Sequence, residues 1–250
     1  MQDWPVGYGR RVLAEVDSTN AEAVRIAAGL AGAEWILGLR QTAGRGRRGR
    51  EWRSQDGNFA ATLVLRPTDA PDVMALRSFV ASLALFDAFV AVTGRSQGFS
   101  LKWPNDVLLN GGKVAGILLE SAGFAAGKVS HLAIGIGVNL KYTPDVDQLE
   151  ATATRPVSLL SECGAEVDPE TFLDVLAPAY AHWEHQFVTY GFEPIRTAWL
   201  ARAAKLGEVI TARTVRDETV GTFETVDKSG NLVLKTAQGA VAIPAADIFF

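Results

Sequence analysis

Five arginines and three glycines alternate between Gly44 and Arg53, in the segment GRGRRGREWR. Glycines allow a loop to fold closely over a ligand and to turn backbone N–H groups toward it. Arginines supply planar forks of donors that pair with two oxygens of a phosphate or carboxylate. Because the arginine charges repel one another in the absence of an anion, the segment predicts a loop that closes on a phosphate-bearing ligand.

Other interpretations of this arginine loop are available. Gly44, Gly46 and Gly49 match G-x-G-x-x-G, but a dinucleotide fold needs a helix after the glycines, and here the chain runs into a strand-like segment. A Walker A loop also fails, because Val114 follows Lys113 where Ser or Thr is required. A solvated basic loop or an RNA-binding patch stays open as a simpler interpretation of the same charges.

A second group of polar residues occurs in KWPNDVLLNGGKVAGILLES, residues 102–121. Asp106 lies at a predicted turn, where it could contact a metal-bound phosphate or a hydroxyl. Lys113 begins an apolar run and could neutralise a carboxylate and a phosphoryl oxygen together. Its position fits a solvated strand-end lysine equally well. In GIGVN, Gly135–Asn139, the glycines would let a ligand approach a buried strand closely.

The elements that would position these residues alternate between strands and helices. The arginine loop joins two strand-like runs, which predicts a hairpin with an unusually long connection. Thr19 and Glu22 have capping-box spacing, which predicts a helix beginning at DSTN. The patterns predict strands at 11–16, 34–41 and 58–65, a helix at 71–93, four strands between 99 and 140, helices between 157 and 205, and short strands in the last 45 residues.

The composition limits the possible functions. The 250 residues carry a net charge of −4, so a protein that binds nucleic acid through a broad basic face is disfavoured. Cys163 is the only cysteine, which excludes an internal disulfide and favours the cytoplasm. The N-terminus lacks the apolar region of a signal peptide. The apolar stretch Phe79–Val92 is too short to span a bilayer and predicts a core helix.

Taken together, DSTN, QTAGRGRRGREW, KWPND, GGKVAGILLE and GIGVN occur in the order and spacing of the biotin protein ligases, and the sequence resembles that family over essentially its whole length. The resemblance implies an α+β fold. Residues 1–206 would form a catalytic domain with a mixed, mostly antiparallel sheet and flanking helices, similar to class II aminoacyl-tRNA synthetases. Residues 207–250 would form a small SH3-like β-barrel. Only 16 residues precede DSTN, so a monofunctional ligase without an N-terminal DNA-binding domain is expected.

The resemblance also implies a reaction. Biotin and Mg-ATP would form biotinyl-5′-AMP, and a lysine of a biotin carboxyl carrier protein would then take the biotinyl group, in an adenylate mechanism. The expected protein partner is that carrier, or the carrier domain of a biotin-dependent carboxylase. Binding to DNA or to a membrane is not expected, whereas a homodimer is possible.

Site residues carry over from the motifs that match. Lys113 and Arg47 are expected to be catalytic, and the resemblance gives no metal ligands. The expected biotin pocket consists of Ser18, Thr19, Asn20, Gln41, Arg45, Gly46, Arg47, Lys113 and Gly116, and the expected ATP site consists of Arg50, Trp52, Asn105, Asp106 and Asn139.

Alternatives stay open for several of these assignments. DSTN could simply cap a helix, and Asn139 could be a strand-end turn residue. His182 and His185 resemble a metal pair but lack a third ligand, and together with His131 they are more typical of structural residues. For the whole protein, the alternatives are a lipoate or octanoate ligase or transferase of the same fold, and a nucleic-acid-binding or regulatory module that uses the arginine loop.

Overall fold

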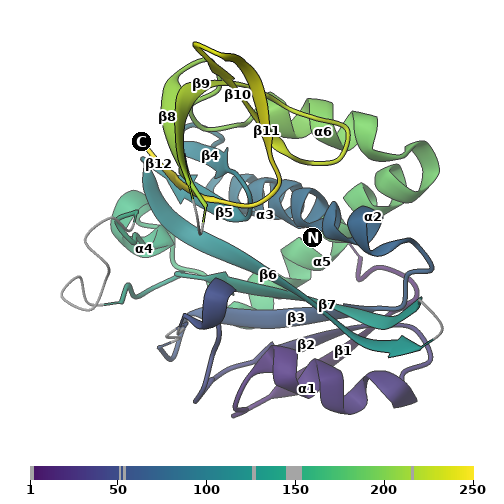
Figure 1. The fold of residues 1–250 in the computed structure, drawn as a ribbon. Helices are drawn as coiled ribbons and strands as arrows, with labels where there is room; N and C mark the ends of the chain where they lie inside the picture. Colours follow the sequence, from purple (N-terminus) through teal and green to yellow (C-terminus); the bar gives the residue numbers. More distant parts are fainter. Residues whose placement is uncertain (1–2, 51, 53–54, 126–127, 145–153, 215–216) are drawn as a thin grey trace.

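The computed structural model describes residues 3–50, 52, 55–125, 128–144, 154–214 and 217–250. Arg53, one of the five loop arginines, lies outside these ranges. The chain forms a large mixed sheet covered by helices on both faces, and a smaller sheet formed by the C-terminal residues that packs beside one end of it (Figure 1). The predicted α+β class is confirmed.

The large sheet has seven strands in the order β1-β2-β3-β7-β6-β5-β4. β1 and β2 are parallel, and every other neighbouring pair is antiparallel. The hairpin predicted around the arginine loop is confirmed, because β2 pairs antiparallel with β3. The strands are β1 (Tyr8–Leu13), β2 (Ala33–Gly38), β3 (Phe59–Leu65), β4 (Phe99–Lys102), β5 (Asp106–Leu109), β6 (Gly112–Ala125) and β7 (Lys128–Val138).

Helix α1 (Thr19–Ile26) covers one face of this sheet, and α3 (Arg77–Thr93) and α5 (Pro169–Tyr190) cover the other (Figure 1). Trp183 on α5 donates to Asp87 Oδ2 on α3 at 2.7 Å, which ties the two long helices together. Gly94 ends α3 at a φ of 72°, where glycine costs least. The shorter helices are α2 (Pro71–Ala75), α4 (Leu159–Cys163) and α6 (Phe192–Leu200).

The predicted core helix is confirmed. Within the described residues, 71–93 is the one helical stretch long and apolar enough to cross a membrane, and 72% of its most apolar window is buried inside the protein. Phe79, Leu83 and Phe89 are among the α3 side chains that fill the core between the helices and the sheet.

The capping box predicted for Thr19 and Glu22 is wrong. Ser18 is the N-cap of α1, with extended backbone angles (φ −154°, ψ 133°), and its side chain accepts from the Ala21 N–H. The cap therefore begins one residue earlier. Because Ser18 takes the capping role, the side chain of Thr19 makes contacts outside the helix.

The C-terminal sheet is antiparallel throughout, in the order β11-β10-β9-β8-β12. The turn between β9 and β10 contacts the turn that follows β4, since Trp103 Nε1 donates to Gly230 O at 3.0 Å. The expected boundary near Gly207 stays a prediction. The strands are β8 (Val209–Arg213), β9 (Glu218–Val226), β10 (Leu232–Thr236), β11 (Gly239–Ile243) and β12 (Asp247–Phe249).

Candidate active site

A cavity of about 470 Å³ lies where the start of α1, the arginine loop, strands β4 to β7 and β12 meet. All fourteen residues predicted for the biotin pocket and the ATP site line this cavity. They come from five separate sequence motifs, so the fold gathers them in one place. The lining also includes the predicted close-approach glycines Gly135 and Gly137, and residues that were not expected there, among them Lys102, Trp103 and 246–249.

One end of the cavity is polar and almost closed to solvent. Ser18, Thr19 and Asn20 are each only 4% exposed. The Thr19 N–H donates to Gln41 Oε1 at 2.8 Å, which ties the start of α1 to the segment before the arginine loop. A small ligand at this end would meet hydroxyl and amide groups whose positions are already fixed.

Lys113 lies at the start of β6, facing this cavity. Its Nζ forms an ion pair of 2.7 Å with Asp106 Oδ1 and lies 5.7 Å from the ring centroid of Trp52. Its backbone bonds to Arg155 O and Val157 N, which anchor the strand end. The side chain is 28% exposed, and its contacts with Asp106 and Trp52 favour a place in the cavity over the solvated strand-end alternative.

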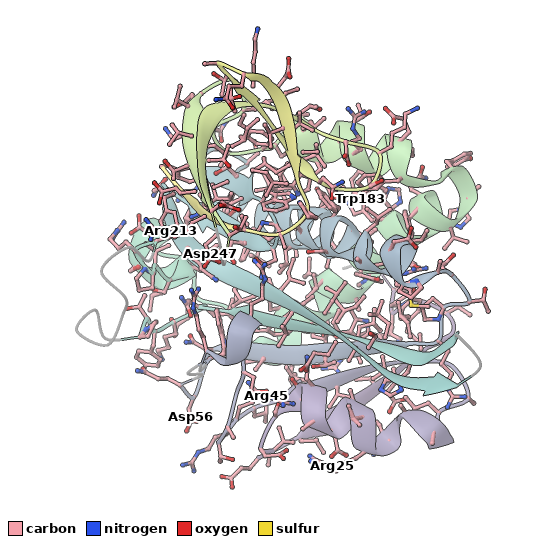
Figure 2. The ribbon with its side chains drawn as sticks, in the orientation of Figure 1. Arg25, Arg45, Asp56, Trp183, Arg213 and Asp247 are labelled. Atoms are coloured by element: carbon pink, nitrogen blue, oxygen red, sulfur yellow. The ribbon has the colours of Figure 1, made fainter. Side chains whose placement is uncertain are left out.

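The arginine loop contacts three different parts of the site. Arg47 donates to Asn105 Oδ1 at 3.2 Å, and Arg50 pairs with Asp247 Oδ2 at 3.1 Å. Arg45 lies 3.9 Å from Glu120 Oε2. Figure 2 labels Arg45 beside the large sheet and Asp247 at the base of the small one. The loop thus brings several guanidinium groups to the rim of one cavity.

Two glycines form a floor for Trp52. Gly116 on β6 and Gly137 on β7 are paired across the sheet. A Cβ added to Gly137 would lie 2.3 Å from the indole, and one added to Gly116 would lie 3.3 Å from it. A side chain at Gly137 would therefore displace Trp52, so what the strand glycines admit closely here is this indole, while close approach of a ligand stays a prediction.

With this geometry in place, the comparisons with known proteins decide the family. Residues 14–139 match the biotin/lipoate A/B protein ligase family, and residues 205–250 match the biotin protein ligase C terminal domain. A biotin–[acetyl-CoA-carboxylase] ligase of Paracoccus denitrificans is 58% identical over 96% of this chain and 99% of its own. The chain belongs to the biotin protein ligase family.

Further members of the biotin protein ligase family agree in fold. The ligase of Aquifex aeolicus, solved in complex with biotin and ATP, superposes with a TM-score of 0.80 at 25% identity, over 96% of this chain and 97% of its own. The bifunctional ligase/repressor of Bacillus subtilis is 33% identical over 85% of this chain, but only 65% of its own length is matched. The predicted resemblance is confirmed.

Lys102 is a site residue that the sequence analysis missed, although it begins the quoted KWPND motif of this biotin protein ligase family member. It is 7% exposed, and its Nζ donates to Thr154 Oγ1 at 2.6 Å. Burial lowers the pKa of Lys102, and the nearby charge of Lys113 lowers it further. In the sequence, Lys102 could have been recognised by its position at the end of a predicted strand, separated from Asp106 by a short turn.

Other polar residues have structural roles. The side chain of Asn139 donates to Val157 O at 3.1 Å, in agreement with the alternative that it is a strand-end turn residue. Asn139 also lines the cavity. Burial lowers the pKa of His131, and the nearby Arg66 charge adds to this effect. Among the described residues, no group of three or more His, Cys, Asp and Glu side chains could hold a metal ion. His182 instead packs edge-on against Trp183.

Proposed function

We propose that this protein joins biotin to a lysine of the biotin carboxyl carrier protein of acetyl-CoA carboxylase, converting ATP to AMP and diphosphate through biotinyl-5′-AMP. The observation that carries the proposal is the convergence of Lys113, Arg47 and the polar pocket in one cavity. The 58% identity to a biotin–[acetyl-CoA-carboxylase] ligase supports the same substrate and carrier.

In the first step, the carboxylate of biotin attacks the α-phosphorus of ATP. A bond forms between a carboxylate oxygen and Pα, the bond from Pα to the bridging oxygen breaks, and diphosphate leaves. Two anions must approach each other, so fixed positive charge is the main catalytic need. Lys113 and Arg47 supply it, and Asp106 and Asn105 hold them in place.

In the second step, the amine of the carrier lysine attacks the acyl carbonyl of the adenylate. An amide bond forms, the acyl–oxygen bond breaks, AMP leaves, and the amine loses its proton. The arginine loop would cover the adenylate between the two steps and keep water away from the reactive anhydride. The carrier must then reach the open rim of the cavity.

Mg²⁺ enters this scheme as part of the substrate Mg-ATP. It usually keeps several waters and binds to phosphate oxygens together with one or two carboxylates. Asp106 and Asp247 both line the cavity and are the carboxylates placed to contribute. The paucity of clustered ligands among the described residues suits a metal held mainly by the nucleotide.

Several expectations about this ligase stay predictions: a cytoplasmic location, a possible homodimer, the absence of DNA and membrane binding, and a separate C-terminal SH3-like domain. The lipoate alternative shares the family description of residues 14–139, but the match of residues 205–250 to a biotin protein ligase domain favours biotin. The arginine loop contacts other groups of the cavity, which favours the enzyme over a nucleic-acid-binding module.

The test is ATP–diphosphate exchange with biotin, lipoate and octanoate compared side by side, followed by transfer to a purified carrier domain. Exchange that depends on biotin alone, with labelling of the carrier lysine, is the expected result. Exchange with lipoate or octanoate would move the protein to the sister enzymes. An absence of exchange with all three acids would overturn the proposal.

A further inference from the structure

A chain of polar side chains crosses the sheet beneath the closed end of the cavity. Asn20, from α1, lies flat on β7, and a Cβ added to Gly135 would come within 2.3 Å of Asn20 Oδ1. Thr62 on β3 and Glu120 on β6 flank it, because β3 and β6 are the two neighbours of β7. Thr62 Oγ1 lies 2.6 Å from Asn20 Oδ1, and Asn20 Nδ2 lies 2.7 Å from Glu120 Oε2.

The hydrogen-bond directions follow from what each group can donate. The carboxylate of Glu120 only accepts, so the Asn20 amide turns its nitrogen toward Glu120 and its oxygen toward Thr62. The amide oxygen also only accepts, so Thr62 donates its single hydroxyl proton to Asn20 Oδ1. The reverse orientation of the amide would place its oxygen against the carboxylate.

Thr19 completes the chain. Its Oγ1 lies 2.8 Å from Thr62 Oγ1 and 3.1 Å from Gln41 Oε1. The Gln41 oxygen already accepts from the Thr19 N–H. A carbonyl oxygen can accept two hydrogen bonds, so the Thr19 hydroxyl donates to the same Gln41 oxygen. The donated bonds run in one direction from Thr62 through Asn20 to Glu120, and Thr19 lies beside Thr62 at the start of this chain.

We propose that Thr62 and Glu120 are positioning residues that hold the Asn20 amide as a hydrogen-bond donor, so that this end of the cavity selects a ligand head with a carbonyl acceptor. The Asn20 nitrogen has a second N–H, and Asn20 lines the cavity. In biotin that acceptor is the ureido carbonyl, an identification that rests on the proposed function. Thr62 is 0% exposed, so it acts through Asn20 and not by contact with the ligand.

The matched pair Thr62→Val and Thr62→Ser tests this inference. Valine keeps the shape and removes the hydroxyl, which leaves the buried Asn20 oxygen without its donor, whereas serine keeps the hydroxyl. We expect Thr62→Val to raise the Kd for biotin by calorimetry, and the KM for biotin in exchange, about ten-fold. The kcat should change less than two-fold, and Thr62→Ser should resemble the wild type.

Two ligand probes show which group is recognised. Desthiobiotin keeps the ureido carbonyl, so Thr62→Val should lower its affinity by the same factor as it lowers that of biotin. Diaminobiotin lacks that carbonyl, so its affinity, measured by the same calorimetry, should be unchanged by the substitution. An equal loss for diaminobiotin would overturn the assignment of a carbonyl acceptor.

A double-mutant cycle separates positioning from general destabilisation. In an Asn20→Ala background, Thr62→Val should add less than a two-fold further loss of biotin affinity, because its target is gone. Ser82→Ala is a control, since it deletes another buried hydroxyl, one that donates to Phe79 O on α3. An undiminished ten-fold effect in Asn20→Ala, or an unchanged Kd in folded Thr62→Val, would overturn the inference. Failure of the proposed function would instead show as loss of biotin-dependent exchange in the wild type and Thr62→Ser.

Discussion

Arg50 and Asp247 form an ion pair of 3.1 Å although 197 residues separate them. The pair connects the arginine loop of the large sheet to the final strand of the small one. Both residues line the cavity. The C-terminal sheet therefore supplies a wall of the cavity and also a carboxylate that holds one of the loop cations.

Replacing Asp247 with Ala tests this connection. The Arg50 side chain is 49% exposed, so an ion pair of this kind contributes at most about 1 kcal/mol, and we expect little change in Tm. Without this ion pair, Arg50 and the arginine loop should be held less firmly at the cavity, which should raise the KM for ATP a few-fold in the exchange assay. Glu208→Ala is the control, because it breaks the exposed Lys205–Glu208 pair just before β8, and neither of these residues lines the cavity. An equal effect of both substitutions would contradict the assigned role.

Lys113→Ala should separate binding from chemistry. The polar end of the cavity is formed by other residues, so the biotin Kd should change only a few-fold. Removing a cation from the point where charge develops should lower the rate of adenylate formation by about 10²- to 10³-fold. Single-turnover formation of biotinyl-5′-AMP measures this rate. Lys141→Ala is the control, since Lys141 pairs loosely with Glu166 and lies off the cavity lining. Near-normal adenylation by Lys113→Ala would remove Lys113 from its role.

The sequence was sufficient to predict the local elements and the residues of the quoted motifs. The arginine loop, Lys113 and Gly135–Asn139 carry unusual residue types at fixed spacing, so they could be recognised without a structure. Thr62 and Glu120 could not, because each is an ordinary residue in a strand. Their significance depends on β7 lying between β3 and β6, a pairing of distant segments that no local pattern specifies.

The same reason explains the missed contribution of the last strand. Asp247 follows a run of short strands with no motif around it, and its partner Arg50 is expected at the ATP site only from the family resemblance of the loop motif. The misplaced helix cap has a different cause. Ser18 and Thr19 are both good capping residues, and only the backbone angles of Ser18 decide between them.

Gly137→Ala should disturb Trp52 specifically. The new Cβ would lie 2.3 Å from the indole, so the ring must move off its floor. Overpacking of this kind typically costs about 1–3 kcal/mol of stability, and the KM for ATP should rise if Trp52 belongs to the ATP site, as its motif predicts. Tryptophan fluorescence and the exchange assay measure the two effects. Gly29→Ala is the control, because an added Cβ there meets nothing within 4 Å. Wild-type kinetics in Gly137→Ala would show that the position of Trp52 does not matter.

Lys102→Met tests the cation that the sequence analysis did not select. The Lys102 ammonium is held by Thr154 Oγ1 and lies 4.6 Å from the ring centroid of Phe250, at the end of the cavity that β12 closes. A triphosphate is the most highly charged part of the substrates, and a buried cation binds it more strongly than an exposed one. We therefore expect the KM for ATP to rise about ten-fold or more, while the biotin Kd stays within two-fold. Lys102→Arg, which keeps the charge, should recover part of the ATP affinity. If Lys102→Met weakened biotin binding as much as ATP binding, the lysine would be supporting the cavity as a whole and not the nucleotide.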